Sequence, residues 1–200
     1  KDMMRDFSLY IMLIIFISIA FGFVVAYWRF KGRIASLKSL AFSDDLGIFN
    51  HRELKKELKS LIKNPDIDSF VFVLVDIDRF KNHNDHNGNS NSDILLQEFV
   101  NVTKKFIRNS DLFFRYKNGD EFALIFKNTG ISEAKEIGNR FRRFIANHPF
   151  VINDQDVNLT VSMGITSCQK DDKPENVRKR AELALHEAKL SKDTVVLIEK

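Results

Sequence analysis

The sequence lacks several features that define other classes of protein. It has a single cysteine, Cys168, so no disulfide can form within the chain, which fits a reducing compartment. Its five histidines do not form a metal-ligand spacing with Cys168, which argues against a zinc site. There is no internal repeat and no low-complexity tract, and a composition of 44% hydrophobic and 29% charged residues excludes a chain that is disordered throughout.

A strong excess of one charge is also missing. The formal net charge is +4, and part of it is concentrated between Arg29 and Lys38. A nucleic-acid-binding domain would carry a basic stripe along its folded surface. We therefore expect no nucleic acid among the partners of this protein.

One long stretch, from Phe7 to Trp28, contains no charged residue at all. A helix of this length spans roughly 30 Å of hydrocarbon. Tyr27 and Trp28 stand at its end, where amphipathic rings prefer the membrane–water interface. Lysine and arginine are in excess on its C-terminal side, which places that side in the cytoplasm. The pattern predicts an N-terminal tail and single transmembrane helix over residues 1–28, in the inner (cytoplasmic) membrane.

Two other interpretations of this stretch fit less well. A cleaved signal peptide would have a shorter apolar region followed by an A-x-A-like site, and a buried core helix would show a polar face. After the stretch, residues 29–42 have the spacing of a short linker helix. Because the first residue is Lys1 rather than methionine, we expect the sequence to be part of a longer chain.

The remaining residues, 43–200, read as one α/β (α+β) domain. Their hydrophobic periodicity predicts helices and strands in alternation, with Asn118-Gly119 as the turn of a hairpin. In chain order the expected elements are helix 51–63, strand 70–75, helix 93–107, strands 112–116 and 121–126, helix 132–147, strands 150–152 and 157–166, helix 174–191 and strand 195–198. This order predicts a mixed, mostly antiparallel sheet flanked by helices.

Carboxylates follow two of these expected strands. Asp76 and Asp78 end the buried strand, while Asp120 and Glu121 come just after the hairpin turn. If the strands are neighbours, these like charges meet at one edge of the sheet and raise one another's pKa values. A divalent cation bound through oxygen relieves that repulsion, and two such ions can drive an in-line displacement at phosphorus. The alternative is that all four are solvated loop acids.

Several ordered motifs make the pattern specific. The stretch from Asp76 to Asp93 is similar to D-x-D-x-F-K-x-x-N-D-x-x-G-x-x-x-x-D, and Gly119-Asp120-Glu121-Phe122 resembles the signature of GGDEF domains, the diguanylate cyclases. The other matching segments are 44–52 near the start of the domain, 159–165 in a strand and 181–189 in the last helix. The resemblance covers about residues 43–199 and implies a palm-like nucleotidyl cyclase fold.

The resemblance also implies roles for individual residues. Asp76, Asp120 and the Ile77 carbonyl would bind Mg²⁺ or Mn²⁺. The implied catalytic residues are Asp120, Glu121 and Lys81; the implied substrate-binding residues are Arg79, Phe80, Asn84, Asp93 and Lys189; and the implied inhibitory product site is Arg108 with Asp111. The implied reaction condenses two GTP molecules into cyclic di-GMP with release of pyrophosphate, across a homodimer in which each domain holds one GTP.

The sequence departs from the family pattern at the signature and after the last helix. The signature contains one extra residue in its Lys117-Asn118-Gly119 turn, and Asp193 replaces a phosphate-binding arginine. These changes keep a second hypothesis open, in which a degenerate domain binds GTP or cyclic di-GMP and signals without turnover. A palm-type cyclase acting on ATP is a third, against which Asn84 and Asp93 argue, since both match guanine-reading positions.

Overall fold

The structure of the protein is a computed structural model that describes residues 19–29, 31, 44–64, 67, 69–81, 89–117, 119–153 and 155–199. The chain divides into two compact units, Lys1–Phe42 and Ser43–Lys200. The expected organisation into tail and transmembrane helix (1–28), linker (29–42) and domain (43–200) stays a prediction.

The first unit is described as a helix over residues 19–29. Most of the expected membrane helix and most of the expected linker helix lie outside the described residues. Among the residues that are described, no helix combines the length and the apolar character needed to cross a membrane. The membrane anchor therefore stays a prediction.

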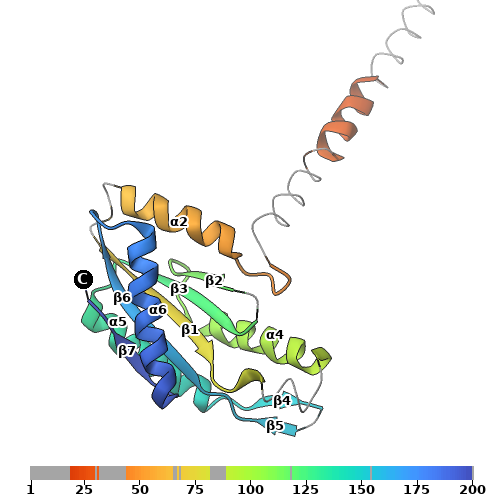
Figure 1. The fold of residues 1–200 in the computed structure, drawn as a ribbon. Helices are drawn as coiled ribbons and strands as arrows, with labels where there is room; N and C mark the ends of the chain where they lie inside the picture. The colour runs from red at the N-terminus through yellow and green to blue at the C-terminus, as the bar shows by residue number, and fades with distance from the viewer. Residues whose placement is uncertain are drawn as a thin grey trace, which may run out of the picture. The chain divides into compact units, whose positions relative to one another are not determined.

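The second unit is built on a five-stranded sheet in the order β2-β3-β1-β6-β7 (Figure 1). The bounds of its strands are Ser69–Ile77 (β1), Leu112–Arg115 (β2), Glu121–Lys127 (β3), Val161–Gln169 (β6) and Val195–Leu197 (β7). All neighbouring pairs are antiparallel except β6 and β7, which are parallel. A separate hairpin consists of β4 (Phe150–Ile152) and β5 (Gln155–Val157). The predicted mixed, mostly antiparallel sheet is confirmed.

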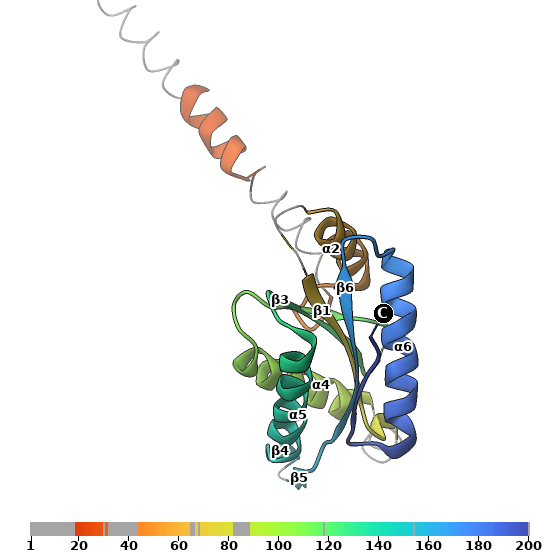
Figure 2. The ribbon, with the colours of Figure 1, turned by 90° about the vertical axis from the view of Figure 1, so that its left-hand side faces the viewer.

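Helices cover both faces of this sheet. Figure 2 shows α6 on one side of the strands and α4 and α5 on the other. The bounds of the helices are His51–Lys63 (α2), Asn89–Phe106 (α4), Ile131–Ala146 (α5) and Pro174–Ser191 (α6). One buried cluster joins the sheet to α4 and α5, and a second joins it to α2 and α6.

The central strand β1 is apolar on both faces, as its unbroken hydrophobic run predicts. Val73 and Val75 belong to the cluster under α4 and α5, whereas Phe72 and Leu74 belong to the cluster under α6. Because side chains alternate along a strand, Asp76 falls on the α6 face, where Leu74 already lies. The strand thus delivers a carboxylate to the edge of an apolar layer.

The strand expected over residues 157–166 is wrong as a single element. The structure divides it between β5 and β6, with a break before Val161. At the break Asp78 N–H donates to the Thr160 carbonyl oxygen (2.9 Å), and the Thr160 hydroxyl donates to the Asp78 carboxylate (2.7 Å). This tertiary contact between distant residues sets where β6 begins, so local periodicity could not reveal it.

Candidate active site

The acidic residues at the end of β1 and just after the hairpin turn do meet at one edge of the sheet. In the antiparallel register of β1 and β3, Asp76 lies opposite Glu121. The Ile77 N–H donates to the Asp120 carbonyl oxygen at 3.3 Å. The predicted convergence of these carboxylates is confirmed by the register.

Asp76 is the most buried member of this cluster, with 2% of its surface exposed. The Lys189 ammonium donates to its Oδ2 at 2.7 Å. Burial nevertheless raises the pKa of Asp76 to about 6, and the charges of Asp120 and Glu121 act in the same direction against Lys189. Burial also raises the pKa of Asp120. The site therefore holds carboxylates whose charged form is disfavoured mainly by burial.

The same acidic cluster also shifts the pKa of Lys189. Burial would lower its pKa, but the hydrogen bond that Lys189 donates to Asp76 and the charges of the nearby acids outweigh burial and raise the pKa of the ammonium. The sequence predicted that Lys189 contacts phosphate. In the structure it reaches Asp76 from α6, so it sits at the edge of the acidic cluster.

The donor set suits a hard cation. Mg²⁺ takes only one or two protein carboxylates and completes its shell with water and phosphate oxygens. Asp76 and Asp120 supply that number. Burial is the main cause of their raised pKa values, and a divalent cation would stabilise both carboxylates in their charged form. Within the described ranges, no group of three or more histidine, cysteine, aspartate and glutamate side chains could hold a metal ion. A dedicated all-protein metal cage is thus absent from that part of the chain.

Asp78, the acid that directly follows β1, has a structural role. Its carboxylate accepts hydrogen bonds from the Ser162 hydroxyl (2.6 Å), the Thr160 hydroxyl (2.7 Å) and the Asp193 N–H (2.8 Å). These contacts tie the end of β1 to β6 and to the segment after α6. The Asp78 carboxylate thus holds three segments of the fold together through hydrogen bonds.

The signature turn between β2 and β3 is held by Arg115. Its guanidinium donates to the Gly119 carbonyl from Nη2 (2.9 Å) and to Asp45 (2.8 Å) and Asp44 (3.3 Å) from Nη1. Gly119 has a φ of +115°, a conformation that favours glycine. Arg115 fixes the turn just before Asp120, a role that sequence reasoning missed although the residue stands in the signature.

The backbone directly after Asp78 departs from ordinary strand and helix conformations. Arg79 has a φ of +59°, and consecutive N–H groups at such a position can form a concave nest for an anion. Phe80 is buried, whereas Arg79 and Lys81 are exposed. This arrangement fits the phosphate contacts that the sequence assigned to these three residues.

The two predicted guanine-reading residues are less completely described. Asn84 lies outside the described residues. Asp93 is exposed and lies on α4. Their pairing around a base stays a prediction.

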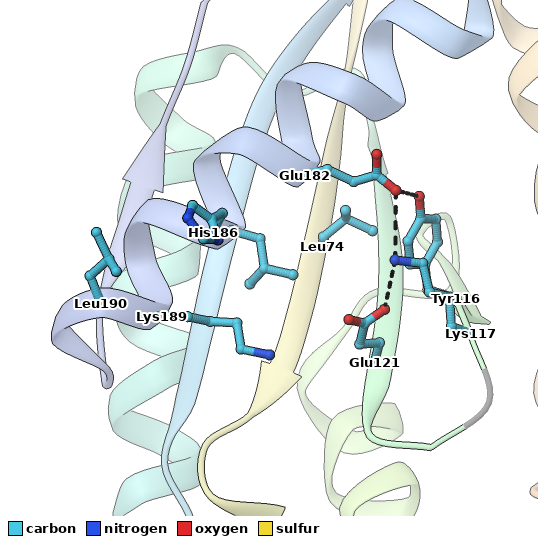
Figure 3. A pocket seen from close by; sticks show the side chains of 9 residues that line it. Leu74, Tyr116, Lys117, Glu121, Glu182, His186, Lys189 and Leu190 are labelled. Carbon is cyan, nitrogen blue, oxygen red and sulfur yellow. Dashed lines mark hydrogen bonds and ion pairs between the residues drawn. The ribbon is translucent and has the colours of Figure 1, made fainter.

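A pocket of about 520 Å³ opens beside the acidic cluster, between the signature turn and α6 (Figure 3). Glu121 and Lys189 line it together with Tyr116 and Glu182. The Tyr116 hydroxyl donates to Glu182 Oε1 at 2.6 Å, and burial, with this acid, raises the pKa of Tyr116. No motif in the sequence pointed to Glu182, because its partner is 66 residues away in the chain.

The turn after α6 shows the second departure from the family pattern. Lys192 has a φ of 59° and a ψ of 166°, and Asp193 has a φ of 43°. Asp193 forms an ion pair with Arg142 of α5. The acid that replaces an expected cation is thus itself neutralised by a guanidinium.

The predicted inhibitory site lies at the other end of β2. The Arg108 N–H donates to Asp111 Oδ2 at 3.0 Å, which closes a turn between α4 and β2. The Arg108 side chain is 65% exposed and lies 3.8 Å from Glu133 of α5. Binding of a product there stays a prediction.

Comparison with known proteins agrees with this geometry. The family model "Diguanylate cyclase, GGDEF domain" matches residues 41–194. The response regulator PleD of Caulobacter vibrioides is 34% identical over 158 residues, which cover 76% of this chain and 35% of PleD. Diguanylate cyclase A of Treponema denticola is 32% identical over 123 residues, which cover 61% of this chain and 33% of that protein. The chain thus spans about a third of the length of these two curated relatives.

Solved structures show the same fold. The coiled coil and GGDEF domain of DgcB from Caulobacter crescentus, in complex with c-di-GMP, aligns with a TM-score of 0.80 at 20% identity over 88% of this chain and 95% of that one. The diguanylate cyclase SiaD of Pseudomonas aeruginosa aligns with a TM-score of 0.74 at 25% identity over 88% of this chain and 68% of that one. The resemblance seen in the sequence is confirmed: the chain belongs to the GGDEF domain family of diguanylate cyclases.

Proposed function

We propose that this protein is a diguanylate cyclase, which condenses two GTP molecules into cyclic di-GMP and releases pyrophosphate. The observation that carries the proposal is the buried Asp76 opposite Glu121, next to Asp120, with a pKa raised to about 6. Such a cluster is costly in a domain that never binds a cation. It is well suited to a domain that binds a nucleotide together with one.

Different residues of the chain would bind the metal, the triphosphate and the guanine base. Asp76 and Asp120, with the Ile77 carbonyl, would hold Mg²⁺ or Mn²⁺, which supplies charge for activating a hydroxyl and stabilising the leaving group. The Arg79–Phe80 backbone and the Lys81 and Lys189 ammonium groups orient the triphosphate. Glu121 supports the acidic cluster from β3. Asn84 and Asp93 select guanine.

Turnover requires two such sites. One domain holds one GTP, so the 3′-OH of one nucleotide reaches the α-phosphate of the other only when two domains face each other. We propose a homodimer arranged in this way. The product then carries two phosphodiester bonds, and each condensation releases one pyrophosphate.

The test is product analysis of residues 35–200 fused to a dimeric coiled coil, with GTP and Mg²⁺. The unit Ser43–Lys200 has its own cores, which supports using it without the first unit. We expect cyclic di-GMP from the wild type and from Asp156→Asn, a matched change at an exposed aspartate of β5, but none from Asp120→Ala. Equal product from the Asp120→Ala variant would contradict the proposal.

A second function is favoured by the turn after α6. The Asp193–Arg142 ion pair and the extra residue in the Lys117-Asn118-Gly119 turn are departures that a non-catalytic receptor would tolerate. In that case the protein would bind GTP or cyclic di-GMP and signal through contacts. Calorimetric binding of either nucleotide without any product from the dimerised wild type would select this function.

We further propose that residues 1–28 anchor the protein in the inner membrane as a single pass and that residues 29–42 link the anchor to a cytoplasmic domain. The support is the uncharged run from Phe7 to Trp28 with lysine and arginine after it. The full chain should stay with membranes after carbonate extraction. Replacing Ile14 and Ile15 by arginine should release it, and release of the wild type itself would contradict the anchor.

A further inference from the structure

Lys117 lies in the signature turn, which is one residue longer than the family pattern, and its side chain points toward the acidic cluster (Figure 3). Its Nζ lies 3.3 Å from Glu121 Oε2 and 3.7 Å from Glu182 Oε1. The same ammonium lies 5.0 Å from the centroid of the Tyr116 ring. One cation therefore bridges a carboxylate of the signature and a carboxylate of α6.

Glu182, the α6 residue of this bridge, is itself held by a hydrogen bond. Glu182 Oε1 accepts the Tyr116 hydroxyl at 2.6 Å as well as facing the lysine. Tyr116 is 1% exposed, so its hydroxyl is a fixed donor that holds Glu182 in place. Glu182 in turn gives the Lys117 ammonium a fixed partner on α6.

The Lys117 bridge offsets part of the negative charge in the acidic cluster. The negative charges of Glu121 and Asp120 both raise the pKa of Asp76, because each of them repels a charged Asp76 carboxylate. Lys189 compensates Asp76 from α6. Lys117 compensates Glu121 from the turn, which leaves each of the two facing carboxylates with its own ammonium.

An ordinary surface ion pair would explain the geometry less well. The Lys117 side chain is 56% exposed, and solvent screens the attraction of such a pair, so its effect on folding is small. Glu121 is only 24% exposed. A contact that holds this carboxylate in one direction would matter for its chemistry even where it adds little to folding stability.

We propose that Lys117 is a positioning residue, which orients the Glu121 carboxylate and couples the signature turn to α6. The proposal rests on the proposed cyclase function, because Glu121 acts there as part of the catalytic cluster. Lys117 itself does not contact the nucleotide in this proposal. Its loss should then slow the chemical step and leave substrate binding nearly unchanged.

The test compares Lys117→Met and Lys117→Arg with a matched control, Lys127→Met. Lys127 lies at the other end of β3 and pairs with Glu57 of α2 at 3.5 Å, so the control removes a similar ion pair away from the site. We expect Lys117→Met to lower kcat about tenfold or more through misorientation of Glu121. KM for GTP should stay within about twofold, because no substrate contact is lost. Lys117→Arg should restore most of kcat, and Lys127→Met should behave as wild type.

Two kinetic results would overturn the proposal. A Lys117→Met variant with the kcat of the control would show that the bridge is only a surface ion pair. A raised KM with unchanged kcat would show that Lys117 binds substrate directly.

A readout without turnover keeps the test separate from the cyclase proposal. In protein labelled with ¹³C at glutamate carboxyls, Lys117→Met should shift the Glu121 and Glu182 resonances, whereas Lys127→Met should leave both in place. Unshifted Glu121 in Lys117→Met would overturn the bridge whether or not the wild type makes cyclic di-GMP. Absence of product from a wild type with the expected shifts would instead overturn the proposed function alone.

Discussion

At the scale of single residues, the site is defined by buried charge. Asp76 is nearly inaccessible to solvent, although its side chain is a carboxylate. It lies on the same face of the sheet as Leu74, the face that α6 covers. Lys189 meets it at 2.7 Å. Asp120 and Glu121 act on the same site, and this concentration of acids is the property that a divalent cation and a nucleotide would use.

The raised pKa of Asp76 predicts a stability effect with a defined sign. The folded state binds the Asp76 proton up to about pH 6, whereas the unfolded chain releases it near its ordinary value of 3.8. Stability from this group is therefore present at low pH and is lost as the pH rises from about 4 to about 6. Without metal, Asp76→Asn should be more stable than wild type by about 1 to 2 kcal/mol at pH 7.5, since loss of the Lys189 contact offsets part of the gain.

Urea unfolding in EDTA at pH 7.5 and pH 4.5 checks this prediction. The advantage of Asp76→Asn should shrink at the lower pH, where the wild-type carboxyl is protonated in the folded state. A variant that is less stable than wild type by the same amount at both pH values would show that the Asp76 charge carries no such cost.

Lys192 provides a second test at this scale. Its φ of 59° and ψ of 166° lie in a region that glycine adopts far more readily than lysine. Lys192→Gly should therefore stabilise the domain by about 1 kcal/mol. The matched change Lys179→Gly, at an exposed position inside α6, should destabilise it by about 1 kcal/mol. Thermal unfolding of both variants decides; destabilisation by both would contradict the strain.

At the scale of elements, α6 matters most because it carries Lys189 and Glu182 to the sheet. Its close approach depends on Gly164 of β6, where an added Cβ would collide with the backbone of Leu185 and Ala181. Gly164→Ala should therefore cost about 2 to 3 kcal/mol of unfolding free energy through overpacking. Gly130→Ala meets nothing within 4 Å and should cost less than about 1 kcal/mol. Equal denaturation midpoints for the two variants would contradict this packing.

Elements with strong local signals could be predicted from the sequence. The expected helices 51–63 and 174–191 agree with α2 and α6, because capping by Asn50 and an initial Pro174 mark their starts. The division between β5 and β6 could not be predicted, since it depends on Asp78 reaching Thr160 across the fold. Local patterns cannot contain such a contact.

The same distinction holds for the site. The meeting of Asp76 with Glu121 followed from two strand ends and a hairpin signal. The bridge from Lys117 to Glu182 did not, because it joins a turn to a helix that is distant in the chain. Only tertiary structure reveals contacts of that kind.

At the scale of the whole molecule, the proposed reaction makes activity depend on assembly. In that proposal each domain of residues 43–200 supplies one nucleotide site, so the isolated domain should be active only when two copies meet. Its specific activity should rise with protein concentration, whereas that of the coiled-coil fusion should stay constant. Activity assays over a hundredfold dilution check this, and a constant specific activity for a domain shown to be monomeric would contradict the dimer mechanism.

Asp76 and Asp120 are proposed to hold a divalent cation against GTP, and a calorimetric titration measures this directly. GTP would be titrated into the dimerised wild type, Asp76→Asn and Asp156→Asn, in Mg²⁺ and in EDTA. We predict that Mg²⁺ tightens GTP binding by about tenfold or more, that Asp76→Asn loses this gain and that Asp156→Asn keeps it. Equal affinity in Mg²⁺ and EDTA, or a full Mg²⁺ effect in Asp76→Asn, would contradict a metal-nucleotide site at this edge of the sheet.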